Sequence, residues 1–138
     1  MPQAVSILIR FVIGGTFVWA CNAVAADLPV VNIQQQGTRL MASGELTVPV
    51  SAATAWAVLT DYEHVPEFVP GMRVSRVVEQ TGNICVVEQQ GEMMANNLRM
   101  FYQGMLRIVE ETPGKLYVQF VSGTFRNMQG QWLSLIHI

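Results

Sequence analysis

The feature that most constrains this sequence is a single helical stretch in a chain otherwise patterned as β-strand. Residues 48–72 read VPVSAATAWAVLTDYEHVPEFVPGM. The Ser51 hydroxyl suits an N-cap, because it can accept from the unpaired N–H groups of a first helical turn. The apolar residues that follow share one helical face: Ala52, Ala55, Trp56 and Leu59. A lone helix placed here must cover one face or one end of the sheet that the flanking strands form.

Proline and glycine punctuate the rest of this stretch. Asp61 and Tyr62 end the first helix. Pro66 suits the first turn of a second short helix over Glu67–Val69, and the Pro70-Gly71 pair then stops it. The sequence therefore predicts two short helices that lead directly into the next strand.

Alternating apolar residues predict an antiparallel meander on either side of the helices. The expected strands are 39–50, 72–80, 84–90, 98–111 and 116–121, with the start of another within 123–132. Turn residues separate them at 81–83 and 112–115. Gly104 is expected to mark a bulge or bend in the long strand. Two segments stay open: 27–36 is extended or a short helix, and 91–97 continues a strand or forms a loop.

The first 26 residues have the pattern of a secretory leader. Arg10 is the only charged residue before Asp27, and Phe11–Ala20 is an apolar run. Small residues at Ala23 and Ala25 fit a cleavage site. We expect a cleavable signal peptide over 1–26 and a secreted or periplasmic protein. The alternative is a retained N-terminal membrane anchor.

The last six residues, 133–138, read LSLIHI and are expected to be a non-native tail. The alternative is a genuine final strand. The predicted domain thus spans 27–132, and His137 carries no functional expectation.

Composition excludes several classes of function. The 138 residues allow one domain, and the formal net charge of −2 gives no electrostatic case for nucleic acid. Walker, Gly-rich dinucleotide and G-x-S-x-G motifs are absent from the sequence, so no cofactor is expected. His64 lies near Asp61, Glu63 and Glu67, but the spacing fits no metal motif. We expect no metal site, a surface histidine, and a buried inert thiol at Cys85.

Apolar side chains near the helices and in the long strands are the candidates for lining a ligand cavity. Flexible thioethers and large aromatic rings suit a surface that adapts to a greasy ligand. The candidates are Trp56, Tyr62, Phe68, Met93, Met100, Met105 and Phe120, with Met94 beside them. The alternative for each is plain core packing between helix and sheet.

Arg99 and Arg107 lie eight positions apart in one expected strand, so an undisturbed alternation puts them on one face. A cationic group inside a groove could meet an anionic or carbonyl-bearing ligand. A solvated outer face is the favoured interpretation, because arginine is rarely buried unpaired. A bulge at Gly104 would break this parity.

Two motifs resemble a known superfamily. The first is a strand ending followed by W-x-x-L-x-D-Y-x-x-x-P-x-F, which here is Trp56, Leu59, Asp61, Tyr62, Pro66 and Phe68. The second is G-x-F followed by G-x-W, within residues 121–132. Together they resemble the START-like or SRPBCC superfamily, which includes the polyketide cyclase/dehydrase and coenzyme Q-binding START families. The resemblance covers roughly Leu40 to Trp132.

The resemblance implies an α+β helix-grip fold of the START/Bet v 1-like kind. In that fold a curved antiparallel β-sheet, with short helices between its first and second strands, wraps a long C-terminal helix around an apolar cavity. This sequence ends before such a helix. We therefore expect a C-terminally truncated fragment whose exposed apolar faces favour aggregation.

The expected function is non-enzymatic binding of a hydrophobic small molecule, such as a lipid, a quinone or a polyketide-like compound. The alternative is an aromatase/cyclase-type enzyme, with Tyr62, Arg99 or Glu92 as acid or base. A convergent pair of titratable groups in the cavity would favour the enzyme, and an apolar wall would favour the carrier. The expected partners are the small molecule and a nearby membrane, and the oligomeric state stays open.

Overall fold

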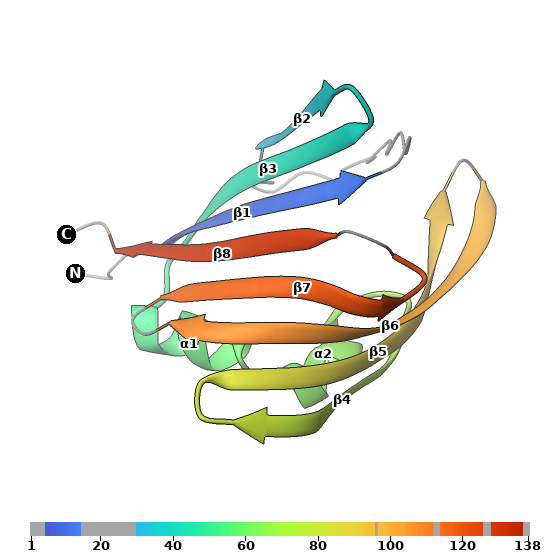
Figure 1. Cartoon of the computed structure of the whole chain (residues 1–138). Helices are drawn as coiled ribbons and strands as arrows, with labels where there is room; N and C mark the ends of the chain where they lie inside the picture. Colours follow the sequence, from blue (N-terminus) through green and yellow to red (C-terminus); the bar gives the residue numbers. More distant parts are fainter. Residues whose placement is uncertain (1–4, 15–29, 96, 112–113, 126–127, 137–138) are drawn as a thin grey trace.

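The structure is a computed structural model of the whole chain and describes residues 5–14, 30–95, 97–111, 114–125 and 128–136. One antiparallel sheet curves over two short helices and a 3-10 turn (Figure 1). The strands are β1 Val5–Gly14, β2 Val30–Gln36, β3 Arg39–Val48, β4 Met72–Thr81, β5 Ile84–Ala95, β6 Leu98–Glu111, β7 Lys115–Gly123 and β8 Gln129–Ile136. The helices are α1 Ala52–Leu59, the 3-10 helix η1 Tyr62–His64 and α2 Val65–Phe68.

The sheet has the strand order β2-β3-β1-β8-β7-β6-β5-β4, and all neighbouring strands in it are antiparallel. Strands β4 to β8 follow one another as a meander, as the turn residues predict. The helices connect β3 to β4, so the chain crosses from one half of the sheet to its far edge beneath the meander (Figure 1). This crossing fixes which face of β4 to β8 the helices cover.

Helix α1 begins where the sequence predicts. The Ser51 Oγ accepts from the Thr54 backbone N–H at 3.1 Å, so Ser51 is confirmed as the N-cap. Ala55 is buried, and Ala52 and Leu59 pack around it. The second helix begins at Val65, two residues before the predicted start, because Pro66 fits the first helical turn without needing a backbone N–H.

Both open segments are strand. Val30–Gln36 forms β2 and pairs with β3. The segment after residue 90 continues β5 as far as Ala95, with Ala95 opposite Leu98. Strand β6 spans Leu98–Glu111, as the sequence predicts.

Gly104 is not a bulge in β6, so that half of the expected bulge or bend is wrong. The pairing of β5 with β6 runs without a shift, and the irregularity lies where β7 meets Met105 and Leu106. A Cβ at Gly104 would lie 2.8 Å from the Ser122 carbonyl oxygen and 3.1 Å from the Phe120 ring. Glycine is needed here because β7 approaches closely, so the alternation along β6 is preserved.

The expectations for the two ends of the chain overlap strands β1 and β8, which lie inside the sheet. Residues 5–14 fall within the predicted leader and form β1, between β3 and β8. Residues 15–29, which contain the expected cleavage site, lie outside the described residues. Residues 133–136 of the predicted tail belong to β8. Leader cleavage, the non-native tail and the missing C-terminal helix stay predictions. Within the described ranges, no helix reaches the length and apolarity that spanning a membrane requires.

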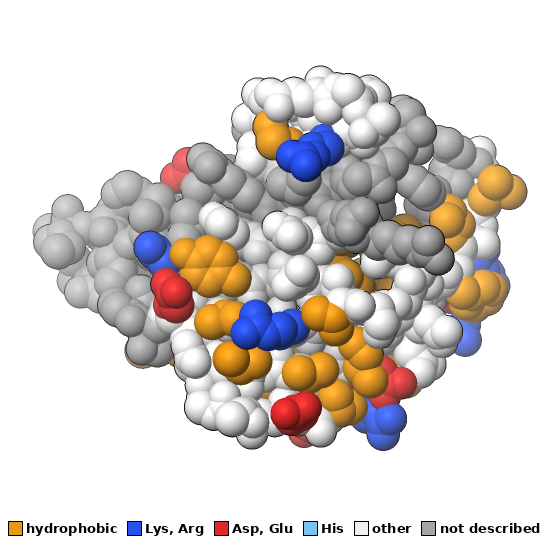
Figure 2. Space-filling model, viewed as in Figure 1, with side chains coloured by type: hydrophobic (Ala, Val, Ile, Leu, Met, Phe, Trp, Pro, Cys, Tyr) orange, Lys and Arg blue, Asp and Glu red, His pale blue; other side chains and the backbone are white. Residues whose placement is uncertain are grey.

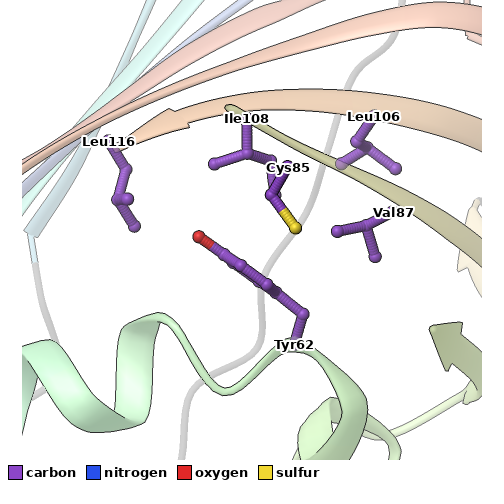
Figure 3. Close-up of a cluster of buried hydrophobic side chains, with 6 residues drawn as sticks. All are labelled: Tyr62, Cys85, Val87, Leu106, Ile108 and Leu116. Atoms are coloured by element: carbon purple, nitrogen blue, oxygen red, sulfur yellow. The ribbon is translucent and has the colours of Figure 1, made fainter. Parts of the chain in front are cut away.

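The core lies between the helices and the middle of the meander (Figure 3). Its buried members are Tyr62, Cys85, Val87, Leu106, Ile108 and Leu116. Cys85 is buried as a free thiol. Burial raises the pKa of this thiol most, and the negative charges of Glu110 and Glu63 raise it further. A protonated, enclosed thiol is a poor nucleophile, which agrees with the expected inert thiol.

Candidate functional site

The candidate site is the face of β4 to β8 that meets the helices, called here the inner face. Directly paired residues of neighbouring strands point to the same side of a sheet. Val87 pairs with Leu106, and Cys85 pairs with Ile108. On the next strand, Val118 and Phe120 pair with the same two β6 residues. These pairings produce a continuous apolar surface three strands wide.

Tyr62 lies over the middle of this surface and comes from η1, between the two helices (Figure 3). Its hydroxyl donates to the Glu110 Oε1 at 2.7 Å. Burial raises the pKa of Tyr62 far above its usual range, and the hydrogen bond and negative charge of Glu110 raise it further. Tyr62 is therefore a fixed hydrogen-bond donor at physiological pH.

A second polar pair lies on the inner face near its β4 edge. Ser75 is buried, and its hydroxyl accepts from the Gln89 Nε2 at 3.2 Å. The two residues are direct cross-strand partners. Like Tyr62 and Glu110, they satisfy each other, so the inner face holds polar groups without leaving these hydroxyls unpaired.

Aromatic rings gather at one end of the inner face. The Phe125 ring centroid lies 5.5 Å from that of Phe120 and 5.7 Å from that of Tyr102. The Tyr102 hydroxyl donates to the Met72 sulfur at 3.5 Å, and burial raises the pKa of Tyr102. A Cβ on Gly91, the cross-strand partner of Tyr102, would lie 2.6 Å from that hydroxyl. Glycine at this position therefore makes room for the tyrosine.

Sequence reasoning did not assign Tyr102 or Phe125 to the site. Phe125 stands in the G-x-F motif, which was used only for the resemblance. Tyr102 shares its strand parity with Met100, which was chosen. The same parity, applied to every residue of β6, would have found it.

Five of the predicted site residues lie on or against the inner face. Phe120 and Tyr62 belong to or pack against the core, as does the partly buried Trp56 from α1. Met100 shares its face with Tyr102, and Met93 is the cross-strand partner of Met100. These five side chains extend the apolar surface from the helices to the aromatic end.

The structure does not bring Phe68 and Met105 to the same surface. Phe68 is more than half exposed on α2. Met105 alternates with Leu106 along an unshifted strand, and its cross-strand partner is Glu88, so it lies on the opposite, outer face. The period of two predicts two faces but does not say which of them meets the helices.

The proposed acid and base candidates are separated. Arg99 and Arg107 are exposed on the outer face of β6, as the favoured interpretation predicts. Glu92 lies on the same outer face, where its Oε2 accepts from the Arg73 guanidinium at 3.0 Å. Tyr62 lies on the inner face, so these groups do not converge.

His64 is exposed, and its Nδ1 lies 2.7 Å from the Asp61 Oδ1. This hydrogen bond and the negative charges of Asp61 and Glu67 raise the pKa of His64. It is a surface histidine, as expected. Among the described residues, no group of three or more His, Cys, Asp and Glu side chains is arranged to hold a metal ion.

A family model described as polyketide cyclase / dehydrase and lipid transport matches residues 48–135. The match runs from the end of β3 to β8 and includes the helices and the whole inner face. Comparisons with curated proteins and with solved structures gave no significant match.

Proposed function

This chain belongs to the polyketide cyclase/dehydrase and lipid transport family of the SRPBCC superfamily, and we propose that it binds a hydrophobic small molecule without changing it chemically. Family membership points to a hydrophobic ligand. The proposed site lies on the inner face beside the buried core, where the partly buried Trp56, Phe120 and Met100 adjoin it. Lipids, quinones and polyketide-like compounds are the ligand classes that suit it.

The observation that carries this proposal is the chemistry of the inner face. Its middle is apolar across three strands, and it ends in adaptable methionines and aromatic rings. Burying about 300 Å² of apolar ligand area would contribute roughly 7.5 kcal/mol before the cost of association. The Tyr62–Glu110 pair supplies a polar group at which a ligand head could be oriented.

Tyr62 also explains why binding is favoured over catalysis. A general acid works best when its pKa lies near the operating pH. The pKa of Tyr62 is raised, which moves it further from neutral pH. The Tyr62 hydroxyl also already donates its hydrogen bond to Glu110. The cyclase-type alternative rests on the same pair, because its two titratable side chains meet on the inner face.

We also place the protein in the periplasm or outside the cell. This proposal rests on the leader pattern of residues 1–26, with Arg10 ahead of an apolar run and small residues at the cleavage position. The size of the N-terminus in protein purified from the native host would test it. Mass spectrometry that finds residues 1–26 intact would favour the membrane-anchor alternative.

Two methionines on one strand test the binding site. Met100 lies on the inner face of β6, and Met105 lies on its outer face. We expect M100Q to weaken binding of N-phenyl-1-naphthylamine, a neutral apolar fluorophore, about tenfold, because an amide of similar length must be desolvated against the probe. The matched control M105Q should leave the affinity within about twofold of the unmodified protein. Fluorescence titration that finds no binding, or equal losses in both variants, contradicts the proposal.

A second experiment separates carrier from cyclase. The full chain is purified from its native host, and native mass spectrometry identifies any bound compound. The proposal expects this compound to be recovered unchanged after prolonged incubation with fresh protein. Accumulation of a product that has lost water, with the unmodified protein but not with E110Q, would establish the cyclase-type alternative.

A further inference from the structure

The hairpin of β5 and β6 projects beyond the rest of the sheet. Strand β4 pairs with β5 only as far as Gly91, and β7 pairs with β6 only from Gly104 onward. Beyond these positions, residues 92–95 and 98–103 have ladder pairs only with each other among the described residues, although Glu92 still bonds to Gly71 and Gln103 to Thr124. This two-stranded segment, called here the ribbon, curls away from the sheet in Figure 1.

The ribbon exposes large apolar side chains. Leu98 is 68% exposed, Phe101 63% and Met94 62%. Leu98 lies on the inner side of the ribbon, and Met94 and Phe101 lie on its outer side, so both sides of its end expose apolar groups. A two-stranded ribbon is marginally stable in water by itself, and exposed apolar surface gathered in one place often marks an interaction site. Apolar side chains placed at the end of a projection are suited to insertion into a partner.

Basic side chains flank these apolar groups. The Arg73 guanidinium stacks over the Phe101 ring at 5.7 Å and donates to Glu92 at 3.0 Å. The Arg99 Nε lies 4.0 Å from the same Glu92 oxygen. Two exposed guanidinium groups, Arg99 of the ribbon and Arg73 of the neighbouring β4, thus share one carboxylate, which leaves one excess positive charge at the base of the ribbon in a chain whose formal net charge is −2. Figure 2 shows hydrophobic and basic side chains side by side on the projecting edge of the molecule.

We propose that the ribbon docks the protein on an anionic lipid bilayer. Leu98, Met94 and Phe101 would enter the boundary between headgroups and acyl chains, and Arg99 and Arg73 would meet the lipid phosphates. Arginine stems cover apolar surface while the charged ends stay in the headgroup layer. An apolar tip rimmed by positive charge is the combination that binds a negatively charged bilayer surface.

The placement of the ribbon adds a second reason. Its inner side carries Leu98 and Met100, and this side continues directly into Tyr102 and Leu106 of the inner face. An apolar molecule leaving a bilayer could follow this side of β6 without crossing open water. This step rests on the proposed function, whereas the docking itself does not.

The test is co-sedimentation of the full chain with vesicles of phosphatidylcholine, with and without one third phosphatidylglycerol. The variant M94S/L98S removes apolar surface from the ribbon, and V31S/I33S removes two exposed apolar side chains from β2 as the matched control. We expect M94S/L98S to lower the partition coefficient on anionic vesicles at least tenfold, and V31S/I33S to change it less than twofold. R99Q should lower it about fivefold and flatten its dependence on salt, because a screened charge is removed.

Several outcomes would overturn the docking proposal. Equal binding by the unmodified protein and M94S/L98S would place vesicle binding elsewhere, such as in the apolar N-terminus. Equal losses of vesicle binding in M94S/L98S and V31S/I33S would show non-specific hydrophobic adsorption. A dimer that M94S/L98S converts to a monomer, without vesicle binding, would make the ribbon a self-association surface.

The control is ligand binding by the same variant. Unchanged affinity of M94S/L98S for N-phenyl-1-naphthylamine would separate a failure of docking from a failure of ligand binding.

Discussion

Strands β5 and β6 pass through two environments. Apolar residues continue along both strands, but the strands and helices that cover them do not. In the closed part, flanked by β4 and β7 and covered by the helices, Val87 is fully buried and Leu106 nearly so. In the ribbon, the same two strands leave Met94 and Leu98 mostly exposed. Burial along a hairpin is therefore decided by how far its neighbours extend. Apolar residues alone do not decide it.

The two regions also differ in what their polar groups do. In the closed part Tyr62 bonds to Glu110 and Ser75 bonds to Gln89, so polar atoms are satisfied inside the protein. At the ribbon, Arg73 of β4 and Arg99 of β6 both interact with Glu92 in contact with solvent. The closed part therefore pairs its polar groups inside the protein, and the ribbon exposes apolar surface and charge.

The largest test of this comparison uses two leucines on the same side of β6. Leu106→Ala should reduce the free energy of unfolding by about 3 kcal/mol, because it opens a cavity in packed surroundings. Leu98→Ala should change it by less than about 0.5 kcal/mol, because the side chain already meets solvent. Urea unfolding followed by circular dichroism measures both. Similar losses at the two positions would mean that the ribbon is packed in solution.

A substitution at the junction between the sheet and the ribbon should have the next largest effect. A Cβ on Gly91 would lie 2.6 Å from the Tyr102 hydroxyl oxygen and 2.7 Å from the Gly71 carbonyl oxygen. The Gly71 carbonyl oxygen belongs to the backbone and cannot rotate away, so Gly91→Ala should lower the free energy of unfolding by about 2 kcal/mol. The same urea assay checks this. A neutral substitution would show that the junction between sheet and ribbon is looser than its packing indicates.

The smallest expected effect concerns the closed part alone. Tyr62→Phe removes the hydrogen bond to Glu110 and should cost about 1 kcal/mol at neutral pH. Because the pKa of folded Tyr62 is raised above its ordinary value of 10.0, its contribution to stability is complete below pH 10 and is lost as pH rises further. The unmodified protein should therefore lose up to about 1.4 kcal/mol more per pH unit above pH 10 than Y62F does.

Urea unfolding at pH 9, 10 and 11 measures this difference. Parallel pH dependence in the two proteins would mean that Tyr62 ionises as readily in the folded state as in the unfolded chain. That result would also remove the main argument against a catalytic tyrosine.

Local patterns in the sequence predicted much of the fold. Ser51 marked the start of α1, the turn at 81–83 separated β4 from β5, and β6 spans its predicted range. These features depend on interactions between residues a few positions apart, such as the bond from the Thr54 N–H to Ser51. The family resemblance, too, rested on short motifs of this kind, and the family match bears it out.

The site was predicted less completely. Met100 and Met105 were chosen for the same chemical reason, yet they lie on opposite faces of β6. Gly104 was expected to mark a bulge or bend, whereas it makes room for β7, and the sequence did not predict the Glu110 partner of Tyr62. Each of these depends on a strand or side chain distant in the sequence.

The sequence by itself determined the helices, the turns and the alternation of the long strands, since these follow from neighbouring residues. Only the tertiary structure decided which side of that alternation meets Tyr62 and the helices, and where β4 and β7 stop flanking β5 and β6. The physical reason is that a period of two defines two equivalent faces. They become different only when the chain crosses beneath one of them and covers it.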